Sequence, residues 1–323
     1  MLIESHFHAP WWVRNPHLQT ILPKWLRKKS AKVVSERFEL PDGDFVDLAW
    51  SGQVMADSRP LVVVFHGLEG SVDSHYATGL FAHLQQTGRE AVLMHFRGCS
   101  GEPNRHLRAY HSGAIEDAQA VISALNQRFP SKPLLAIGYS LGGNMLVNLL
   151  AGDQEVALQG AMVISAPLQL ASSAKRVNQG WSKVYQRYLL HSMRRNLLRK
   201  MARQPEALAH WQPEQIHHIT TLRDFDEQVT APLHGFTSAD HYYQTCSGLP
   251  MLSQITIPTL ILHAADDPFM SHDAIPRADQ LSPMVRYELS QHGGHVGFLY
   301  GTPWRPRFWL DERISRWIDE QLN

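Results

Sequence analysis

The chain has 323 residues, of which 44% are hydrophobic and 19% are charged. A chain of this length can bury a sizeable core. Its 30 basic and 30 acidic residues balance, so the charge does not indicate nucleic-acid binding, and we expect a neutral or apolar substrate. Only Cys99 and Cys246 are present, which excludes a disulfide framework and favours reduced thiols. The apolar runs are far shorter than the roughly 20 residues that span a bilayer. Because the N-terminus also lacks an export signal, we expect a soluble, cytoplasmic protein.

The first part of the chain predicts a hairpin followed by alternating strands and helices. Residues 32–40 and 45–50 have the pattern of two strands around a turn at 41–44. The expected strands that follow cover 61–65, 91–95, 133–137 and 161–165, and the expected helices cover about 74–86, 114–128 and 141–150. Because these strands are apolar throughout, they favour a parallel sheet covered by helices on both faces.

The alternation stops between about residues 169 and 252, where a segment rich in Trp, Tyr, His and Arg predicts helices and loops. We interpret this segment as a helical cap inserted into a single domain of residues 1–323. The alternation resumes with strands at 258–263 and 285–289 and a closing helix at about 307–322. In such a sheet, we expect catalytic groups at the carboxyl ends of the strands.

The segment from Gly138 to Gly142 has the pattern G-x-S-x-G, with Ser140 at its centre. The pattern alone is common, but here it lies directly between a predicted strand and a predicted helix, which is the context of a nucleophile elbow. Glycines suit a strained turn in which other side chains would collide. The sequence therefore predicts Ser140 as a nucleophile. The alternative is an ordinary glycine-rich turn that closes a βα unit.

A serine nucleophile needs a general base and a carboxylate that orients the base. Asp266 and Asp267 both follow the strand at 258–263, and we assign the acid to Asp267, with Asp266 as the alternative. An Asx turn would explain either aspartate without catalysis. His295 lies in a glycine-flanked loop after the last strand, and we assign it as the base, with His292 as its rival.

A tetrahedral intermediate needs backbone N–H donors for its oxyanion. The elbow offers the N–H of Leu141 at the positive end of the following helix. The segment from His66 to Leu68 follows the first central strand and matches an H-G-x motif, which makes the Leu68 N–H the second candidate donor. The alternative for this segment is a tight turn that requires glycine.

These motifs together resemble the α/β-hydrolase superfamily. Residues 15–20, 96–101 and 225–243 further resemble the branch that contains YheT-type bacterial esterases and eukaryotic ABHD-type lipases. The resemblance runs nearly end to end and implies an α/β-hydrolase fold that hydrolyses carboxylic esters, with medium-chain acyl esters or lipids as substrates. It also implies acyl transfer to alcohols as a side activity. The proposed triad does not depart from the family pattern.

The predicted cap contains basic residues interleaved with leucine and tyrosine, which predicts an amphipathic helix. A solvated lid surface is the favoured explanation, and contact with an anionic lipid surface is the alternative. Aromatic residues of the cap either line an acyl pocket or pack the cap onto the core. The basic residues are Lys183, Arg187, Arg194, Arg195, Arg199, Lys200 and Arg203, and the aromatic residues are Trp181, Tyr185, Phe236, Tyr242 and Tyr243.

The resulting hypothesis is a serine hydrolase that acts on a small-molecule ester and needs no cofactor or metal. Its rivals are a thioesterase, an amidase or an acyltransferase on the same triad, a metal-dependent hydrolase that uses the histidines, and a non-catalytic binding protein. The pair His6 and His8 could begin a metal site, but the sequence supplies no further ligands nearby. Acyl chain length and oligomeric state are left open.

Overall fold

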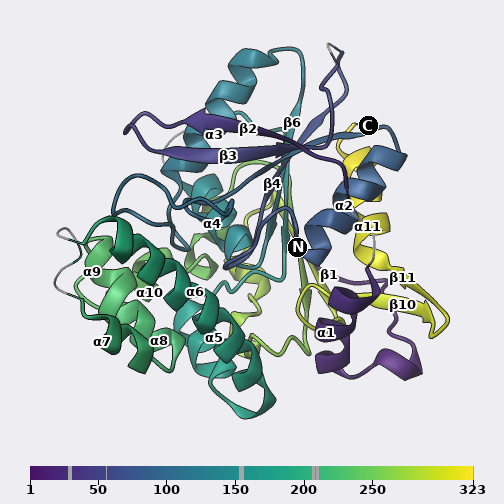
Figure 1. The fold of residues 1–323 in the computed structure, drawn as a ribbon. Helices are drawn as coiled ribbons and strands as arrows, with labels where there is room; N and C mark the ends of the chain where they lie inside the picture. The colour runs from purple at the N-terminus through teal and green to yellow at the C-terminus, as the bar shows by residue number, and fades with distance from the viewer. Residues whose placement is uncertain (28–30, 56, 153–155, 206–207, 209–210, 323) are drawn as a thin grey trace.

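A computed structural model describes residues 1–27, 31–55, 57–152, 156–205, 208 and 211–322. Its strands are β1 (Leu2–Glu4), β2 (Val34–Glu39), β3 (Phe45–Trp50), β4 (Leu61–Phe65), β5 (Glu90–Met94), β6 (Leu134–Tyr139), β7 (Gly160–Ile164), β8 (Thr259–Ala264) and β9 (Val285–Ser290). They form a nine-stranded sheet in the order β1-β9-β8-β7-β6-β4-β5-β3-β2 (Figure 1). Only β2 and β3 run antiparallel to their neighbours in this sheet.

Helices cover both faces of the sheet because the central strands are apolar on both sides. Val62 and Val64 of β4 belong to the core that α2 (His75–Gln86) and α11 (Trp309–Glu320) close. Val63 and Phe65 belong to the core on the other face, which α3 (Glu116–Arg128) and α4 (Leu141–Ala151) close. The predicted fold class, a mostly parallel sheet between two layers of helices, is confirmed.

The predicted elements of the sheet and its covering helices are present, with ends that differ by at most two residues. The closing helix begins at Trp309 and not at 307, because residues 305–308 form β11 (Arg305–Phe308), which pairs antiparallel with β10 (Leu299–Thr302). The sequence did not predict this hairpin, the edge strand β1 or the helix α1 (Pro16–Leu26). Each depends on tertiary contacts, as when the three residues of β1 pair with β9.

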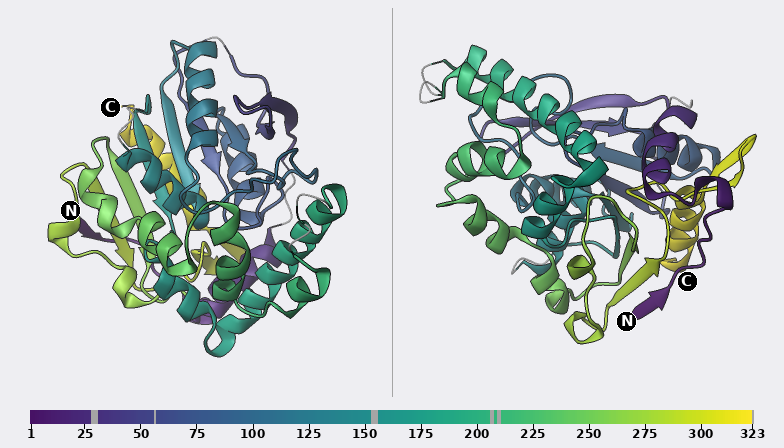
Figure 2. Two further views of the ribbon diagram at one scale, coloured as in Figure 1. Left: turned by 90° about the vertical axis from the view of Figure 1, so that its left-hand side faces the viewer. Right: turned by 90° about the horizontal axis from the view of Figure 1, so that it is seen from below.

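Between β7 and β8 the described residues form helices and no strand. The helices of this region, which we call the helical segment, gather on one side of the molecule away from α2 and α11 (Figures 1 and 2). They enclose an apolar cluster of their own that includes Leu190, Leu197 and Phe225. They are α5 (Leu170–Val177), α6 (Lys183–Arg203), α7 (Pro213–His218), α8 (Leu222–Phe225), α9 (Ala231–Leu233) and α10 (Ala239–Cys246).

Helix α6 is the basic helix that the sequence predicts, but part of its charge lies inside the protein. Lys200 is buried, and its ammonium donates to the carbonyl oxygens of Leu107 and Arg108 at 2.7 and 2.9 Å. Burial lowers the pKa of Lys200 to about 8. Arg194 donates to the carbonyl oxygen of Ile219 at 3.1 Å. Within the described ranges, no helix has the length and apolar character needed to cross a membrane.

Candidate active site

Ser140 lies at the junction of β6 and α4 in a backbone conformation that non-glycine residues rarely adopt, with φ 50° and ψ −121°. The two glycines of the motif, Gly138 and Gly142, lie so close to neighbouring backbone atoms that a side chain would not fit. A Cβ at Gly142 would lie 2.4 Å from the carbonyl oxygen of His66, and a Cβ at Gly138 would lie 2.6 Å from that of Gly142. The strained turn therefore depends on both glycines of the motif.

The structure brings Ser140, His295 and Asp267 together from the carboxyl ends of β6, β9 and β8. Ser140 Oγ lies 3.0 Å from His295 Nε2, and His295 Nδ1 lies 2.9 Å from Asp267 Oδ2. Asp267 is only 3% exposed, and its Oδ1 accepts the N–H of Phe269 at 2.8 Å. A carboxylate can only accept, so Nδ1 donates to Asp267 and Nε2 is left to accept the Ser140 hydroxyl proton.

The two rival residues pair with each other and not with Ser140. Asp266 lies 3.2 Å from His292 Nδ1 through one carboxylate oxygen, and the other oxygen accepts the N–H of Gly294 at 3.0 Å. Burial raises the pKa of Asp266 above its ordinary value. Asp266 thus holds the loop that carries His295, while Asp267 contacts the imidazole itself.

An aromatic stack holds the plane of the His295 ring, and the sequence analysis missed it. Phe269 stacks on His295 with ring centroids 4.0 Å apart and an interplanar angle of 18°. Tyr185 of α6 stacks on the far side of Phe269 at 5.0 Å. The Tyr185 hydroxyl lies 3.0 Å from His17 Nδ1 of α1. The orientation of His295 therefore depends on the helical segment as well as on the sheet.

Helix α1 supports the histidine loop from outside. Thr20 Oγ1 accepts the N–H of His295 at 3.0 Å, and the Gln19 amide exchanges two hydrogen bonds with the backbone of Leu299. The segment 15–20, noted for its resemblance, forms the start of this helix, with the Asn15 side chain accepting two backbone N–H groups. An asparagine cap followed by proline is typical of a helix start, so this signal was available in the sequence.

In the loop after β4, hydrogen bonds fix the direction of the Gly67 carbonyl and therefore that of the Leu68 N–H. Gly67 O accepts from His66 Nδ1 at 2.7 Å and from the N–H of Gly70 at 2.9 Å. His66 Nε2 accepts the N–H of Phe96 at 3.0 Å, which leaves the ring proton on Nδ1. In a trans peptide the C=O and the following N–H point in opposite directions, so the Leu68 N–H faces away from these donors.

The two predicted oxyanion donors, the N–H groups of Leu68 and Leu141, border the same cavity as Ser140. Within the part of the chain that the structure describes, neither N–H group has a hydrogen-bond acceptor. Leu141 is the first residue of α4, so its N–H lies at the positive end of the helix dipole. Two backbone donors are thus available near the Ser140 hydroxyl.

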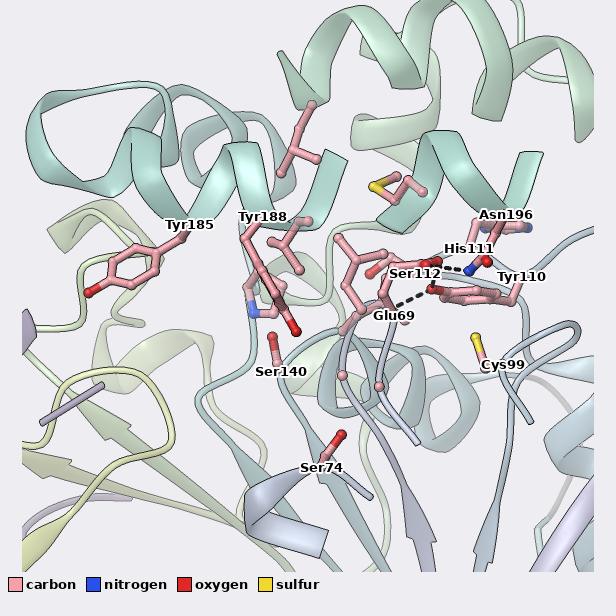
Figure 3. Close-up of a pocket in the computed structure, with 18 of the residues that line it drawn as sticks. Glu69, Ser74, Cys99, Tyr110, His111, Ser112, Ser140, Tyr185, Tyr188 and Asn196 are labelled. Carbon is pink, nitrogen blue, oxygen red and sulfur yellow. Dashed lines mark hydrogen bonds between the residues drawn. The ribbon is translucent and has the colours of Figure 1, made fainter. Parts of the chain in front are cut away.

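A cavity of about 1180 Å³ lies between the sheet and the helical segment, with Ser140 in its wall (Figure 3). His295 borders the same cavity. Of the aromatic residues considered for a pocket, Tyr185, Tyr242 and Tyr243 border it, whereas Trp181 is 78% exposed and Phe236 packs in a small cluster with α10. The apolar side chains that the helical segment contributes include Leu170, Val177, Leu189, Met193, Leu197, Leu222, Phe225, Val229 and Leu233.

Two further histidines have strongly lowered pKa values. Burial lowers the pKa of His75 to about 3 and that of His263 to about 4, which keeps both rings neutral. Among the described residues, no three His, Cys, Asp or Glu side chains lie close enough together to hold a metal ion. That the reaction needs no cofactor stays a prediction.

Comparison with known proteins identifies the family of the chain. Residues 60–302 match the family described as alpha/beta hydrolase fold. The chain is 48% identical over 311 residues to "Putative esterase YheT" of Escherichia coli, covering 95% of this chain and 91% of that protein. It is 25% identical to "Phospholipase ABHD3" of Mus musculus, covering 99% and 80%.

Among solved structures, an esterase of Pyrococcus furiosus shares the fold, with a TM-score of 0.57 at 15% identity over 91% of this chain and 92% of that one. The family match, the high identity to the bacterial relative and the shared fold lead to the same conclusion. The chain belongs to the α/β-hydrolase fold family, in the branch of the YheT-type and ABHD-type proteins.

Proposed function

We propose that this protein is a serine hydrolase that cleaves carboxylic esters with a medium-chain or lipid-like apolar part. One observation carries the proposal. An unbroken chain of hydrogen bonds runs from Ser140 through His295 to the buried Asp267, and it begins in the wall of a large cavity. The esterase and phospholipase names of the relatives support the same reaction class.

In the first step, Ser140 Oγ attacks the ester carbonyl carbon while His295 Nε2 takes the hydroxyl proton. Asp267 stabilises the imidazolium that forms, because it already accepts from Nδ1. The carbonyl oxygen becomes an oxyanion that accepts from the N–H groups of Leu68 and Leu141. The C–O bond to the leaving group then breaks, and His295 returns the proton to the leaving alkoxide.

In the second step, water attacks the acyl-enzyme carbonyl. His295 takes a proton from this water, and the same two N–H groups bind the second oxyanion. The bond to Ser140 Oγ breaks, the serine recovers its proton from His295, and the carboxylic acid leaves. Each proton that His295 accepts is returned within the same step, so the enzyme ends the cycle unchanged.

The shape and lining of the cavity support a substrate with an extended apolar part. Its volume of about 1180 Å³ exceeds the roughly 300–1,000 Å³ of most small-molecule sites. Apolar side chains from α5, α6 and α8 form much of its wall. We therefore propose that residues of about 169–252 act as a cap that forms the acyl pocket within one domain.

The test is hydrolysis of a p-nitrophenyl ester series, from acetyl to long acyl chains, by the wild type and Ser140→Ala. We expect kcat/KM to fall at least about 10⁴-fold in Ser140→Ala. Ser123→Ala is the matched control, because Ser123 is exposed on α3 and does not border the cavity. This control should keep the activity of the wild type.

A fluorophosphonate probe provides a second measurement. Mass spectrometry should find the probe bound to Ser140 in the wild type and no bound probe in Ser140→Ala. Equal hydrolysis by the wild type and Ser140→Ala would overturn the proposal. So would a folded wild type that cleaves none of the esters and does not react with the probe.

A further inference from the structure

Glu69 follows the candidate oxyanion donor Leu68 directly and has a left-handed backbone conformation, with φ 55°. A non-glycine residue keeps such a conformation only when surrounding contacts hold it. Its side chain borders the cavity. The position of the Leu68 N–H therefore depends on what holds Glu69.

Tyr110 holds Glu69 from the side of the sheet. The Tyr110 hydroxyl accepts the backbone N–H of Glu69 at 2.8 Å and donates to Glu69 Oε1 at 2.9 Å. The Tyr110 ring stacks on Phe96 at 5.1 Å and meets the edge of His66, whose Nδ1 binds Gly67 O. One rigid phenol thus fixes both the backbone and the carboxylate of Glu69.

Helix α6 holds the other carboxylate oxygen. Asn196 Nδ2 donates to Glu69 Oε2 at 2.6 Å, across 127 residues of sequence (Figure 3). Ser192 and Arg195 of the same helix also face this carboxylate. The helical segment therefore contacts the loop that carries Leu68 through the Glu69 side chain.

The charge of Glu69 makes this arrangement unexpected. A carboxylate near a developing oxyanion repels it, so electrostatics alone would favour a neutral residue here. Burial raises the pKa of Glu69, and the hydrogen bonds from Tyr110 and Asn196 oppose that rise. What a carboxylate supplies in this place is two acceptor oxygens for donors on two different elements.

The same helix reaches the opposite side of the site. Tyr185 of α6 stacks on Phe269, which stacks on His295. Tyr185 and Asn196 both belong to α6, so one rigid helix contacts the ring of the base and the loop of the oxyanion donor. A shift of α6 would disturb both.

We propose that Glu69 is a positioning residue that couples helix α6 to the oxyanion loop, so that the Leu68 N–H is aligned only when α6 is docked. This inference rests on the proposed function. Glu69 does not touch the reacting atoms; it acts through the backbone of Leu68. Hydrogen bonding to Asn196 and Tyr110 is its essential property, and its charge is not.

An exchange of the two side chains tests this coupling. In Glu69→Gln, Tyr110 keeps its acceptor, and the new amide can donate to the Asn196 oxygen once the Asn196 amide turns over. In Asn196→Asp, two carboxylates face each other. In the double variant Glu69→Gln/Asn196→Asp, the glutamine amide donates to the new carboxylate. The hydrogen bond between the two positions is thus restored, with residue 69 as the donor and residue 196 as the acceptor.

We expect Asn196→Asp to lower kcat about tenfold or more with little change in KM, since an oxyanion contact acts in the transition state. Glu69→Gln should keep most of the kcat of the wild type, because both of its hydrogen bonds can still form. The double variant should recover most of the lost kcat. Arg203→Gln is the control, because it removes another hydrogen bond from α6 to the core, that of Arg203 to Pro103 O, away from the loop. This control should keep the kcat of the wild type.

Inhibition by a trifluoromethyl ketone that carries the acyl chain of the best substrate separates positioning from a general loss of structure. The inhibition constant should rise in proportion to the fall in kcat/KM, while the melting temperature of the active variants stays near that of the wild type. If a single variant does not fold, Tyr110→Phe removes the same support of Glu69 from the other side and should lower kcat similarly.

An Asn196→Asp variant as fast as the wild type would overturn the coupling, and so would a Glu69→Gln variant as slow as Asn196→Asp. A double variant no faster than the slower single variant would overturn it as well. Ser140→Ala is measured in the same assay. If its activity equals that of the wild type, the proposed function fails; if only Ser140→Ala is impaired, this inference fails alone.

Discussion

The loops at the carboxyl ends of the strands and the helical segment differ in where backbone strain lies. Non-glycine residues with positive φ lie in the loops after β4, β6, β7 and β9, whereas among the described residues of the helical segment there are none. They are Glu69, Ser140, Ser165, Val296 and Phe298. Strain of this kind persists only where surrounding structure holds it, and here it surrounds the proposed triad.

The two regions also differ in what their side chains contribute. The loops place the reacting groups within hydrogen-bond distance through backbone geometry, as at Ser140 and Asp267. The helical segment contributes apolar side chains to the cavity wall and a few polar contacts, such as Asn196 with Glu69. Under the proposed function, the loops determine the reaction and the helices determine the substrate.

The largest expected effect separates the two aspartates of the loop after β8. Asp267→Asn should lower kcat about 10⁴-fold, because the amide no longer holds His295 in the required tautomer. Asp266→Asn should cost less than about tenfold, because an amide oxygen can still accept the N–H of Gly294. Steady-state kinetics on one ester measures both. Losses of equal size would show that His295 depends on the conformation of the loop and not on the Asp267 carboxylate in particular.

A smaller effect concerns a carboxyl of the helical segment. Burial raises the pKa of Asp226 from 3.8 to about 6, although the hydroxyl groups of Tyr243 and Thr230 donate to it. The folded protein therefore binds this proton more tightly than the unfolded chain. The resulting stabilisation is complete below pH 3.8 and is lost as the pH rises through 6, at a cost of at most about 3 kcal/mol.

Asp226→Asn removes this titration. The free energy of unfolding of the variant minus that of the wild type should rise between pH 4 and 7 and then level off. Urea unfolding at pH 4.5, 6 and 7.5 measures the difference. A difference that does not change with pH would show that the Asp226 carboxyl has an ordinary pKa in the folded protein.

The smallest effect tests the role of the helices in substrate choice. Met193 of α6 borders the cavity, and Met193→Trp should shorten the space for an acyl chain. We expect kcat/KM to fall about tenfold for long-chain esters and to stay unchanged for the acetyl ester. The matched variant Tyr188→Trp, at a 62% exposed position of the same helix, tests whether bulk at the cavity entrance has the same effect. An equal loss for all chain lengths in Met193→Trp would contradict a role in chain selection.

Particular residues show how far the sequence could lead. Ser140 was found because glycines, a strand and a helix surround it within a few residues, and such local patterns are visible in the sequence. The sequence favours Asp267 over Asp266 without deciding between them, because the two are adjacent and both follow β8. The support of His295 by Thr20 was missed, because 275 residues separate the hydrogen-bonded groups.

The sequence by itself determined the sheet with its covering helices, the nucleophile elbow and the candidates for base and acid. These features follow from apolar periodicity and from glycine at sterically restricted positions, which act over short distances along the chain. Only the tertiary structure decided that Asp267 contacts His295, that α1 supports the histidine loop and that Asn196 reaches Glu69. Such contacts depend on how separate elements pack, because hydrogen bonds between distant segments form only after the sheet and helices have brought them together.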